Sequence, residues 1–264
     1  MLYVNAAFPH VRSFSPCLAL ARVTLDRHRR CFYEVVCFCG AADSRPPAAL
    51  LPLQLINIDN TGSDNIMTPS DTRIYLASGS PRRRELLEQL GVHLERIHAD
   101  IDESVLPGEN AVAYTERLAR EKAAAGWAVV QKCGLPSRPL LSADTTVVLD
   151  GEIFGKPADA ADAARMLRAF SGRSHQVVTS VAIRQDERVE LRTSITEVHF
   201  RVLSETDIQR YIDSGEPFDK AGAYGIQGLA AVFIDHIAGS YTGVMGLPMF
   251  ETAELLGLFG HPFP

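Results

Sequence analysis

The 264-residue sequence predicts an α/β protein in which a mixed β-sheet is flanked by helices. From Ile74 onward, strand-like and helix-like segments alternate, which is typical of strands joined by helical crossovers. Two turns, Asp150-Gly151 and Gln185-Asp186-Glu187, each connect neighbouring strand-like segments as hairpins. Because hairpins give antiparallel pairs and crossovers give parallel pairs, we expect both kinds of pairing in one sheet.

The first strand is predicted at 74–78 and the first helix at 81–90. Ser80 offers an N-cap, and Pro81 suits the first helical position because its missing N–H is not needed there. Three leucines at helical spacing form the buried stripe, and Gly91 ends the helix.

The remaining elements continue the alternation to the end of the chain. Ser204, with Asp207 three residues later, resembles a capping box. The expected elements are an extended segment at 93–98, a helix at 111–127, a strand at 140–149, a hairpin ending at Lys156-Pro157, a helix at 159–170, strands near 175–184 and 190–201, a helix from Ser204 to Gly215, a strand at 229–234 and a helix at 248–257.

The chain changes character near residue 68. Residues 1–67 contain four of the five cysteines and no regular helical or strand period, although 32–38 could pair as a strand. The segment that begins at Met67 resembles the start of a polypeptide. We therefore expect an N-terminal extension at 1–67, either poorly ordered or the product of an over-extended start, followed by one domain at 68–264.

Composition and charge argue against several classes of protein. A formal net charge of −6 argues against non-specific nucleic-acid binding. No apolar run approaches the roughly 20 residues of a membrane span, and the N-terminus lacks the order of a secretion signal. Five cysteines without metal-finger spacing indicate reduced thiols, so we expect a cytoplasmic protein.

Three consecutive arginines, Arg82, Arg83 and Arg84, stand in the first turn of the predicted helix. Cations there oppose the helix dipole, each by roughly 0.3–1 kcal/mol, so an ordinary surface helix would not favour them. Free N–H groups, a Ser-Gly-Ser loop that includes Ser80, and guanidinium groups together predict a polyphosphate-binding site, with at least one of the three arginines facing the loop. The alternative is that the arginines simply extend into solvent.

Two charged residues fall at positions expected to be buried. Lys122 follows Tyr114 and Leu118 at i+8 and i+4 on the core-facing stripe of helix 111–127, so it must snorkel, pair with an acid or meet an anion. Asp144 lies at the centre of an apolar strand, which makes it a candidate general base or metal ligand. A structural role at a bulge is the alternative for Asp144.

Further candidates lie in loops. Asp102 and Glu103 form an acidic turn whose oxygens suit Mg²⁺ or Mn²⁺, although such turns are often only solvated. Lys156 ends a hairpin, where a lysine is most often exposed. The glycine-rich loop 216–228 holds an Asp-Lys pair and Gln227, whose amide complements a uracil or thymine edge.

These motifs resemble those of the Maf-like nucleotide pyrophosphatases, in the same order and over roughly residues 72–260. The motifs are Ser78-Gly79-Ser80-Pro81-Arg82-Arg83, Arg120-Glu121-Lys122-Ala123, Ala143-Asp144-Thr145, Gly155-Lys156-Pro157, Ser171-Gly172-Arg173-Ser174-His175 and the loop from Gly215 to Gly228. The resemblance implies a fold akin to the inosine-triphosphate pyrophosphatases, a homodimer, and metal-dependent hydrolysis of nucleoside triphosphates between the α and β phosphates.

The resemblance also implies a role for each matching residue. Asp144 corresponds to the catalytic base and, with Glu103, to a ligand of Mg²⁺ or Mn²⁺. Residues that correspond to positions setting base preference are Arg82, Thr145 and Gln227. Those that correspond to phosphate contacts are Arg82, Arg83, Lys122 and Lys156.

The glutamine at 227 favours the branch of the family that acts on dTTP and UTP, because the branch acting on 7-methyl-GTP has another residue there. Modified pyrimidine nucleotides are further candidate substrates, and removal of non-standard nucleotides is the role that the family implies. The alternative is a nucleotide-binding regulator of cell division in which hydrolysis is incidental. Release of pyrophosphate from dTTP with Mg²⁺ or Mn²⁺ would distinguish the two.

Overall fold

A computed structural model describes residues 18–25, 31–38 and 73–261. The chain divides into two units, 1–64 and 65–264. In the first unit, β1 (Leu18–Leu25) pairs antiparallel with β2 (Cys31–Phe38), which confirms the strand predicted at 32–38. Most of residues 1–67, including the segment around Met67, lies outside the described residues, so the predicted extension stays a prediction.

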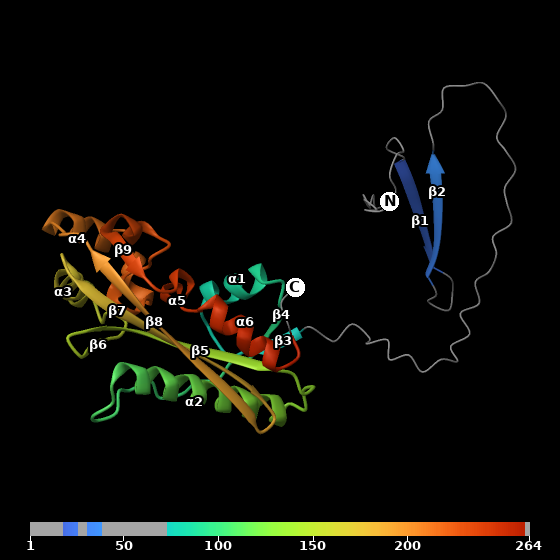
Figure 1. Cartoon of the computed structure of the whole chain (residues 1–264), viewed down its shortest axis with the longest axis horizontal. Helices are drawn as coiled ribbons and strands as arrows, with labels where there is room; N and C mark the ends of the chain where they lie inside the picture. Colours follow the sequence, from blue (N-terminus) through green and yellow to red (C-terminus); the bar gives the residue numbers. More distant parts are fainter. Residues whose placement is uncertain (1–17, 26–30, 39–72, 262–264) are drawn as a thin grey trace, which may run out of the picture. The chain divides into compact units, whose positions relative to one another are not determined.

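The second unit is built on a mixed sheet of seven strands (Figure 1). Its order is β4-β3-β5-β7-β8-β9, and β6 pairs with β5 beside this row. The strands are β3 (Arg73–Leu76), β4 (His93–Arg96), β5 (Leu140–Leu149), β6 (Glu152–Phe154), β7 (Ser174–Gln185), β8 (Arg188–Phe200) and β9 (Ile234–Ala238). β3 is parallel to β4 and β5, whereas the remaining pairs are antiparallel. The predicted mixed α/β fold is confirmed.

Helices cover both faces of this sheet, as Figure 1 shows. The helix α2 (Ala111–Lys132) packs on the face that receives Tyr75 from β3. On the opposite face, α1 (Pro81–Gln89) and α6 (Met249–Leu258) pack against Ile74 and Leu76. Successive β3 side chains therefore enter different cores, because side chains alternate along a strand. The strand needs to be apolar on both faces, as its sequence is.

A third core lies at the other end of the sheet, where α3 (Ala160–Phe170) and α4 (Glu205–Asp213) pack. The capping box at the start of α4 is present as predicted, with Ser204 and Asp207 exchanging hydrogen bonds. His175 is buried there and lies 2.8 Å from the Tyr224 hydroxyl through Nε2. Its Nδ1 has no hydrogen-bond partner. Burial, and to a lesser extent His199, lowers the pKa of His175 to about 3.

Some predicted boundaries are wrong. The strand expected at 229–234 is instead a 3₁₀ helix, Leu229–Phe233, which is followed by β9. Ala230 and Phe233 are buried and Leu229 and Val232 are exposed, which is the three-residue repeat of a 3₁₀ helix. The helix α2 runs to Lys132 rather than 127, and the short α5 (Tyr241–Met245) had no clear sequence signal.

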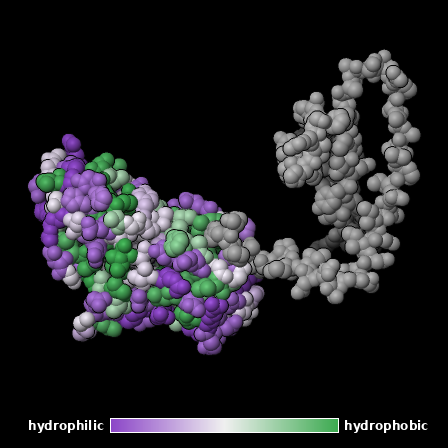
Figure 2. Space-filling view, in the orientation of Figure 1, coloured by the Kyte–Doolittle hydropathy of each residue, from purple (hydrophilic) through white to green (hydrophobic). Residues whose placement is uncertain are grey.

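Figure 2 shows hydrophilic and hydrophobic residues interspersed on the face of the second unit that it displays. Within the part of the chain that the structure describes, no helix combines the length and apolar character required to cross a bilayer.

Candidate active site

A cavity of about 690 Å³ opens where the N-terminus of α1, the centre of β5 and the loop after α4 meet. Of the residues singled out from the sequence for base recognition, phosphate binding, catalysis or metal binding, all but Asp102 line it; Asp102 instead accepts hydrogen bonds from Ser104. The lining residues are Ser80, Arg82, Arg83, Glu103, Lys122, Asp144, Thr145, Lys156 and Gln227. The structure therefore brings the predicted site residues together, from segments up to 147 positions apart in the sequence, while their individual roles stay predictions.

The arginines at the start of α1 have three different environments. Ser80 is the N-cap, and its side chain makes no capping hydrogen bond. Arg82 Nη1 lies 3.2 Å from Asp219 Oδ2, and Asp219 belongs to the loop after α4, which also lines the cavity. Arg84 is exposed and pairs with Glu88 at 3.7 Å, so the alternative of an arginine extending into solvent holds for this residue.

Arg83 is half-buried, and desolvation lowers the pKa of its guanidinium. It donates through Nε to the Gly246 carbonyl at 2.7 Å and through Nη2 to Thr145 Oγ1 at 3.1 Å. Thr179 also donates to Thr145, at 3.0 Å. The Arg83 side chain and the Thr145 hydroxyl are thus fixed in place on the cavity wall. Neither Thr179 nor Gly246 carried a sequence signal.

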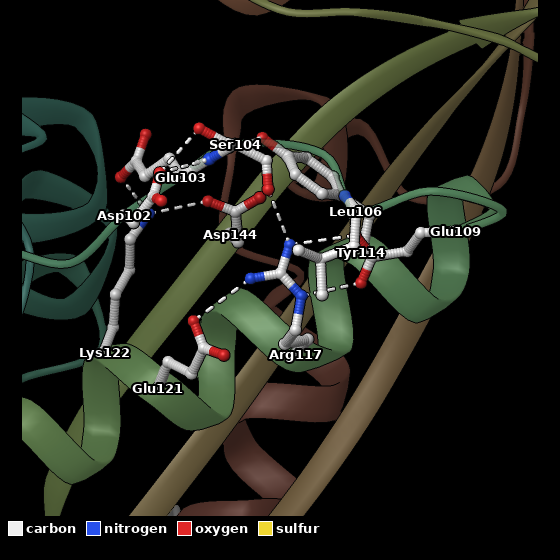
Figure 3. Close-up of polar contacts among 10 residues, drawn as sticks. All are labelled: Asp102, Glu103, Ser104, Leu106, Glu109, Tyr114, Arg117, Glu121, Lys122 and Asp144. Carbon is white, nitrogen blue, oxygen red and sulfur yellow. Dashed lines mark hydrogen bonds and ion pairs between the residues drawn. The ribbon is translucent and has the colours of Figure 1, made fainter.

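Lys122 joins two of the acidic residues of the cavity, Glu103 and Asp144. Its Nζ lies 2.7 Å from Glu103 Oε1 and 2.7 Å from Asp144 Oδ1 (Figure 3). Of the alternatives for Lys122, the structure therefore shows pairing with acids. Asp144 lies opposite Ser180 in an unbroken β5–β7 register, so it does not occupy a bulge.

The two carboxylates have pKa values shifted in opposite directions. Burial raises the pKa of Asp144, and the charge and hydrogen bond of Lys122 only partly oppose this. Burial alone would raise the pKa of Glu103 as well, but the hydrogen bond and charge of Lys122, together with the charges of Lys156 and Arg83, outweigh it, and the pKa is lowered. Opposite shifts in a pair of acids are typical of sites in which the two have different roles. Asp144 is the group better suited to accept a proton.

Helix α2 holds the acidic turn that carries Glu103 (Figure 3). The Tyr114 hydroxyl donates to the Glu103 carbonyl at 2.9 Å, and Arg117 Nη2 donates to the Ser104 carbonyl at 2.9 Å. Arg117 is itself held by both carboxylate oxygens of Glu109, at 2.7 and 2.8 Å. Sequence reasoning missed Arg117, because a helical arginine near glutamates is usually a surface residue.

The loop after α4 forms another wall of the cavity and carries Gln227. Asp219 and Lys220 also line this wall, and Lys220 Nζ lies 2.6 Å from Asp219 Oδ1. The sequence places this Asp-Lys pair in a candidate ligand loop but assigns it no role. Asp219 contacts both Lys220 and Arg82, so it links the loop to the start of α1.

The donor set is compatible with a divalent ion that has few protein ligands. In the described residues, no group of three or more His, Cys, Asp or Glu side chains could hold a metal ion. Glu103 and Asp144 nevertheless direct two carboxylates at one cation, the Lys122 ammonium. Mg²⁺ is often held by one or two carboxylates together with substrate phosphates and water, and these two residues fit that pattern.

Fold and site together define an α/β protein with a cavity in which cationic groups surround a buried carboxylate. The family model described as Maf-like protein matches residues 73–259. The chain belongs to the Maf-like family.

Two relatives of high sequence identity are both named dTTP/UTP pyrophosphatase. The dTTP/UTP pyrophosphatase of Chromobacterium violaceum is 74% identical over 198 residues, which cover 75% of this chain and all of that protein. The dTTP/UTP pyrophosphatase of Aromatoleum aromaticum is 55% identical over 205 residues, covering 74% of this chain and all of the relative. Among solved structures, the Ham1 protein of Staphylococcus aureus is 16% identical with a TM-score of 0.37, over 48% of this chain and 71% of that one.

Proposed function

We propose that the protein is a nucleoside triphosphate pyrophosphatase that converts dTTP and UTP, and modified pyrimidine nucleotides, to the monophosphate and pyrophosphate. The observation that carries the proposal is one cavity that joins Arg83 and Lys156 to the carboxylates of Glu103 and Asp144. Such an arrangement suits a polyphosphate that must be both bound and hydrolysed. The names of the relatives from C. violaceum and A. aromaticum support the substrates.

In the proposed reaction, Asp144 accepts the proton of the attacking water. Its raised pKa supports this role, because a general base works best when its pKa approaches the working pH. Arg82, Arg83, Lys122 and Lys156 neutralise charge on the phosphates and on the departing pyrophosphate. When bound by Glu103 and Asp144, Mg²⁺ or Mn²⁺ would supply Lewis-acid polarisation of the phosphate oxygens.

Base preference is assigned to Arg82, Thr145 and Gln227. The amide of Gln227 offers one donor and one acceptor direction to the edge of a pyrimidine, which matches the adjacent carbonyl and N–H of uracil or thymine. Arg83 and Thr179 support this role for Thr145, because they hold its hydroxyl in one position.

The test is a panel of nucleoside triphosphates incubated with the full-length protein and Mg²⁺ or Mn²⁺, with monophosphate and pyrophosphate measured together. We expect equal amounts of UMP and pyrophosphate from UTP, a similar result for dTTP, and slower turnover of CTP and GTP. Release of UDP and inorganic phosphate, or no turnover of any nucleotide, would contradict the proposal.

We also propose that the protein is a cytoplasmic homodimer that binds neither nucleic acid nor membrane. The free thiol of exposed Cys133 supports a reducing compartment, and the net charge of −6 supports the absence of nucleic-acid binding. Light scattering after size-exclusion chromatography should give twice the 28.9 kDa mass of the chain. A monomeric mass would contradict the dimer.

A further inference from the structure

The segment 225–229, which carries Gln227, is anchored by two side chains that lie outside the cavity lining. At its start, the Gly225 N–H donates to the Tyr211 hydroxyl at 3.2 Å. At its end, the Leu229 N–H donates to Glu216 Oε2 at 2.9 Å. Both anchors thus act on the backbone on either side of Gln227.

The two anchors are also joined to each other. The Tyr211 hydroxyl donates to Glu216 Oε1 at 2.9 Å, so a single chain of hydrogen bonds runs from Gly225 to Leu229. Tyr211 is buried on α4, with 3% of its surface exposed, and burial together with Glu216 raises the pKa of its hydroxyl. The phenol therefore stays protonated and remains a donor to Glu216.

The backbone between the anchors is closely packed. Gly228 donates to the Gly225 carbonyl at 3.0 Å, which closes a turn around Gln227. A Cβ at Gly228 would collide with the Glu216 carboxylate, and a Cβ at Gly225 would lie 2.7 Å from Lys220 Cε. Gly228 thus permits the close approach of this turn to its anchor Glu216, and Gly225 permits that of Lys220.

We infer that Tyr211 and Glu216 are positioning residues for base recognition, acting through the backbone of the turn that presents Gln227. This inference rests on the proposed function, in which Gln227 contacts the base. An amide can distinguish the C4 carbonyl of UTP from the C4 amine of CTP only if its donor is held in one orientation. Loosening either anchor allows the turn to move and the amide to accommodate both bases.

The test measures kcat and KM for UTP and for CTP in Tyr211→Phe and in Glu216→Gln. Each change keeps the shape of the side chain and removes hydrogen bonds of the chain from Gly225 to Leu229. We expect the UTP-to-CTP ratio of kcat/KM to fall roughly 3- to 10-fold, the effect of losing one ordinary hydrogen bond. Matched controls are Tyr241→Phe, at an exposed tyrosine, and Glu205→Gln, at a surface glutamate of α4, which should keep the wild-type ratio.

A purely structural role would lower kcat/KM for both nucleotides by the same factor, so an unchanged UTP-to-CTP ratio in either variant that folds would overturn the inference. Because the two variants disturb opposite ends of the chain of hydrogen bonds, either one that folds suffices for the test, with thermal unfolding as the check. If the wild-type protein releases no pyrophosphate from UTP, the proposed function fails instead, so the two failures are distinguishable.

Discussion

Replacing Lys122 by Met tests the energetic contribution of the buried ion pair between Lys122 and Asp144 in the cavity. The change keeps most of the volume of the side chain and removes the ammonium that lies 2.7 Å from Asp144 and from Glu103. Asp144 is only 7% exposed, so it would remain as a buried carboxylate without its closest positive partner. Removing one member of a buried pair costs about 3–5 kcal/mol. Since Arg83 still contributes a favourable charge, we expect about 3 kcal/mol.

The stability cost of Lys122→Met should depend on pH. The folded pKa of Asp144 already lies above its ordinary value, and loss of Lys122 raises it further. The penalty is present above the folded pKa and is relieved as the pH falls through it, because the carboxyl then becomes neutral. Urea unfolding at pH 8 and pH 5 should therefore show a smaller cost of Lys122→Met at pH 5.

Two further variants make the measurement specific. Arg84→Met removes a positive charge from the exposed pair with Glu88 and should cost less than about 0.5 kcal/mol. The double variant Lys122→Met/Asp144→Asn should recover much of the lost stability, because no unpaired carboxylate remains on β5. A cost for Lys122→Met no greater than that for Arg84→Met would refute the buried pair.

Three other predictions concern separate parts of the molecule. In urea unfolding, wild-type stability should fall between pH 7 and pH 5 by roughly 2 kcal/mol more than that of His175→Phe. The reason is that an unfolded histidine binds a proton near pH 6.5, whereas the folded His175 does so near 3. Equal losses in both proteins would contradict this. Arg117→Lys should raise the Mn²⁺ concentration for half-saturation several-fold. Lysine cannot reproduce the paired contact with Glu109 that orients Arg117 toward the turn carrying Glu103. The control Arg192→Lys, at an arginine paired with Glu254 away from this turn, should leave the Mn²⁺ concentration unchanged. Gln227→Glu should slow dTTP and UTP hydrolysis by replacing the amide donor with a charge, and an unchanged base preference would exclude Gln227 from base recognition.

Sequence patterns predicted the sheet class and most elements because the signals there are local. The β5 strand is apolar on both sides of its centre, and α1 begins at Ser80-Pro81, a pair typical of the N-cap and first position of a helix. The strand prediction for 229–234 failed because a run of six apolar residues fits a short strand as well as a 3₁₀ helix. Only the packing of Ala230 and Phe233 decides between them.

The candidate site was predictable where a charged residue occupies a position that the local sequence pattern expects to be apolar. Lys122 on a buried stripe and Asp144 in an apolar strand both needed partners, and the structure shows that they are partners of each other. Arg117 and Thr179 obey local rules, since a helical arginine and a strand threonine need no explanation. Their contacts with the Ser104 carbonyl and with Thr145 join segments far apart in the sequence, so only the folded chain reveals them.

In the proposed reaction, the Asp144 carboxylate on β5 takes the proton of the water that attacks a triphosphate bound in this cavity. Pyrophosphate release from UTP by Asp144→Asn, at saturating Mg²⁺ and beside the wild type, tests it most directly. We predict a loss of at least about 100-fold, the usual contribution of a positioned general base, in a protein that still unfolds cooperatively. Turnover close to that of the wild type would exclude Asp144 as the general base.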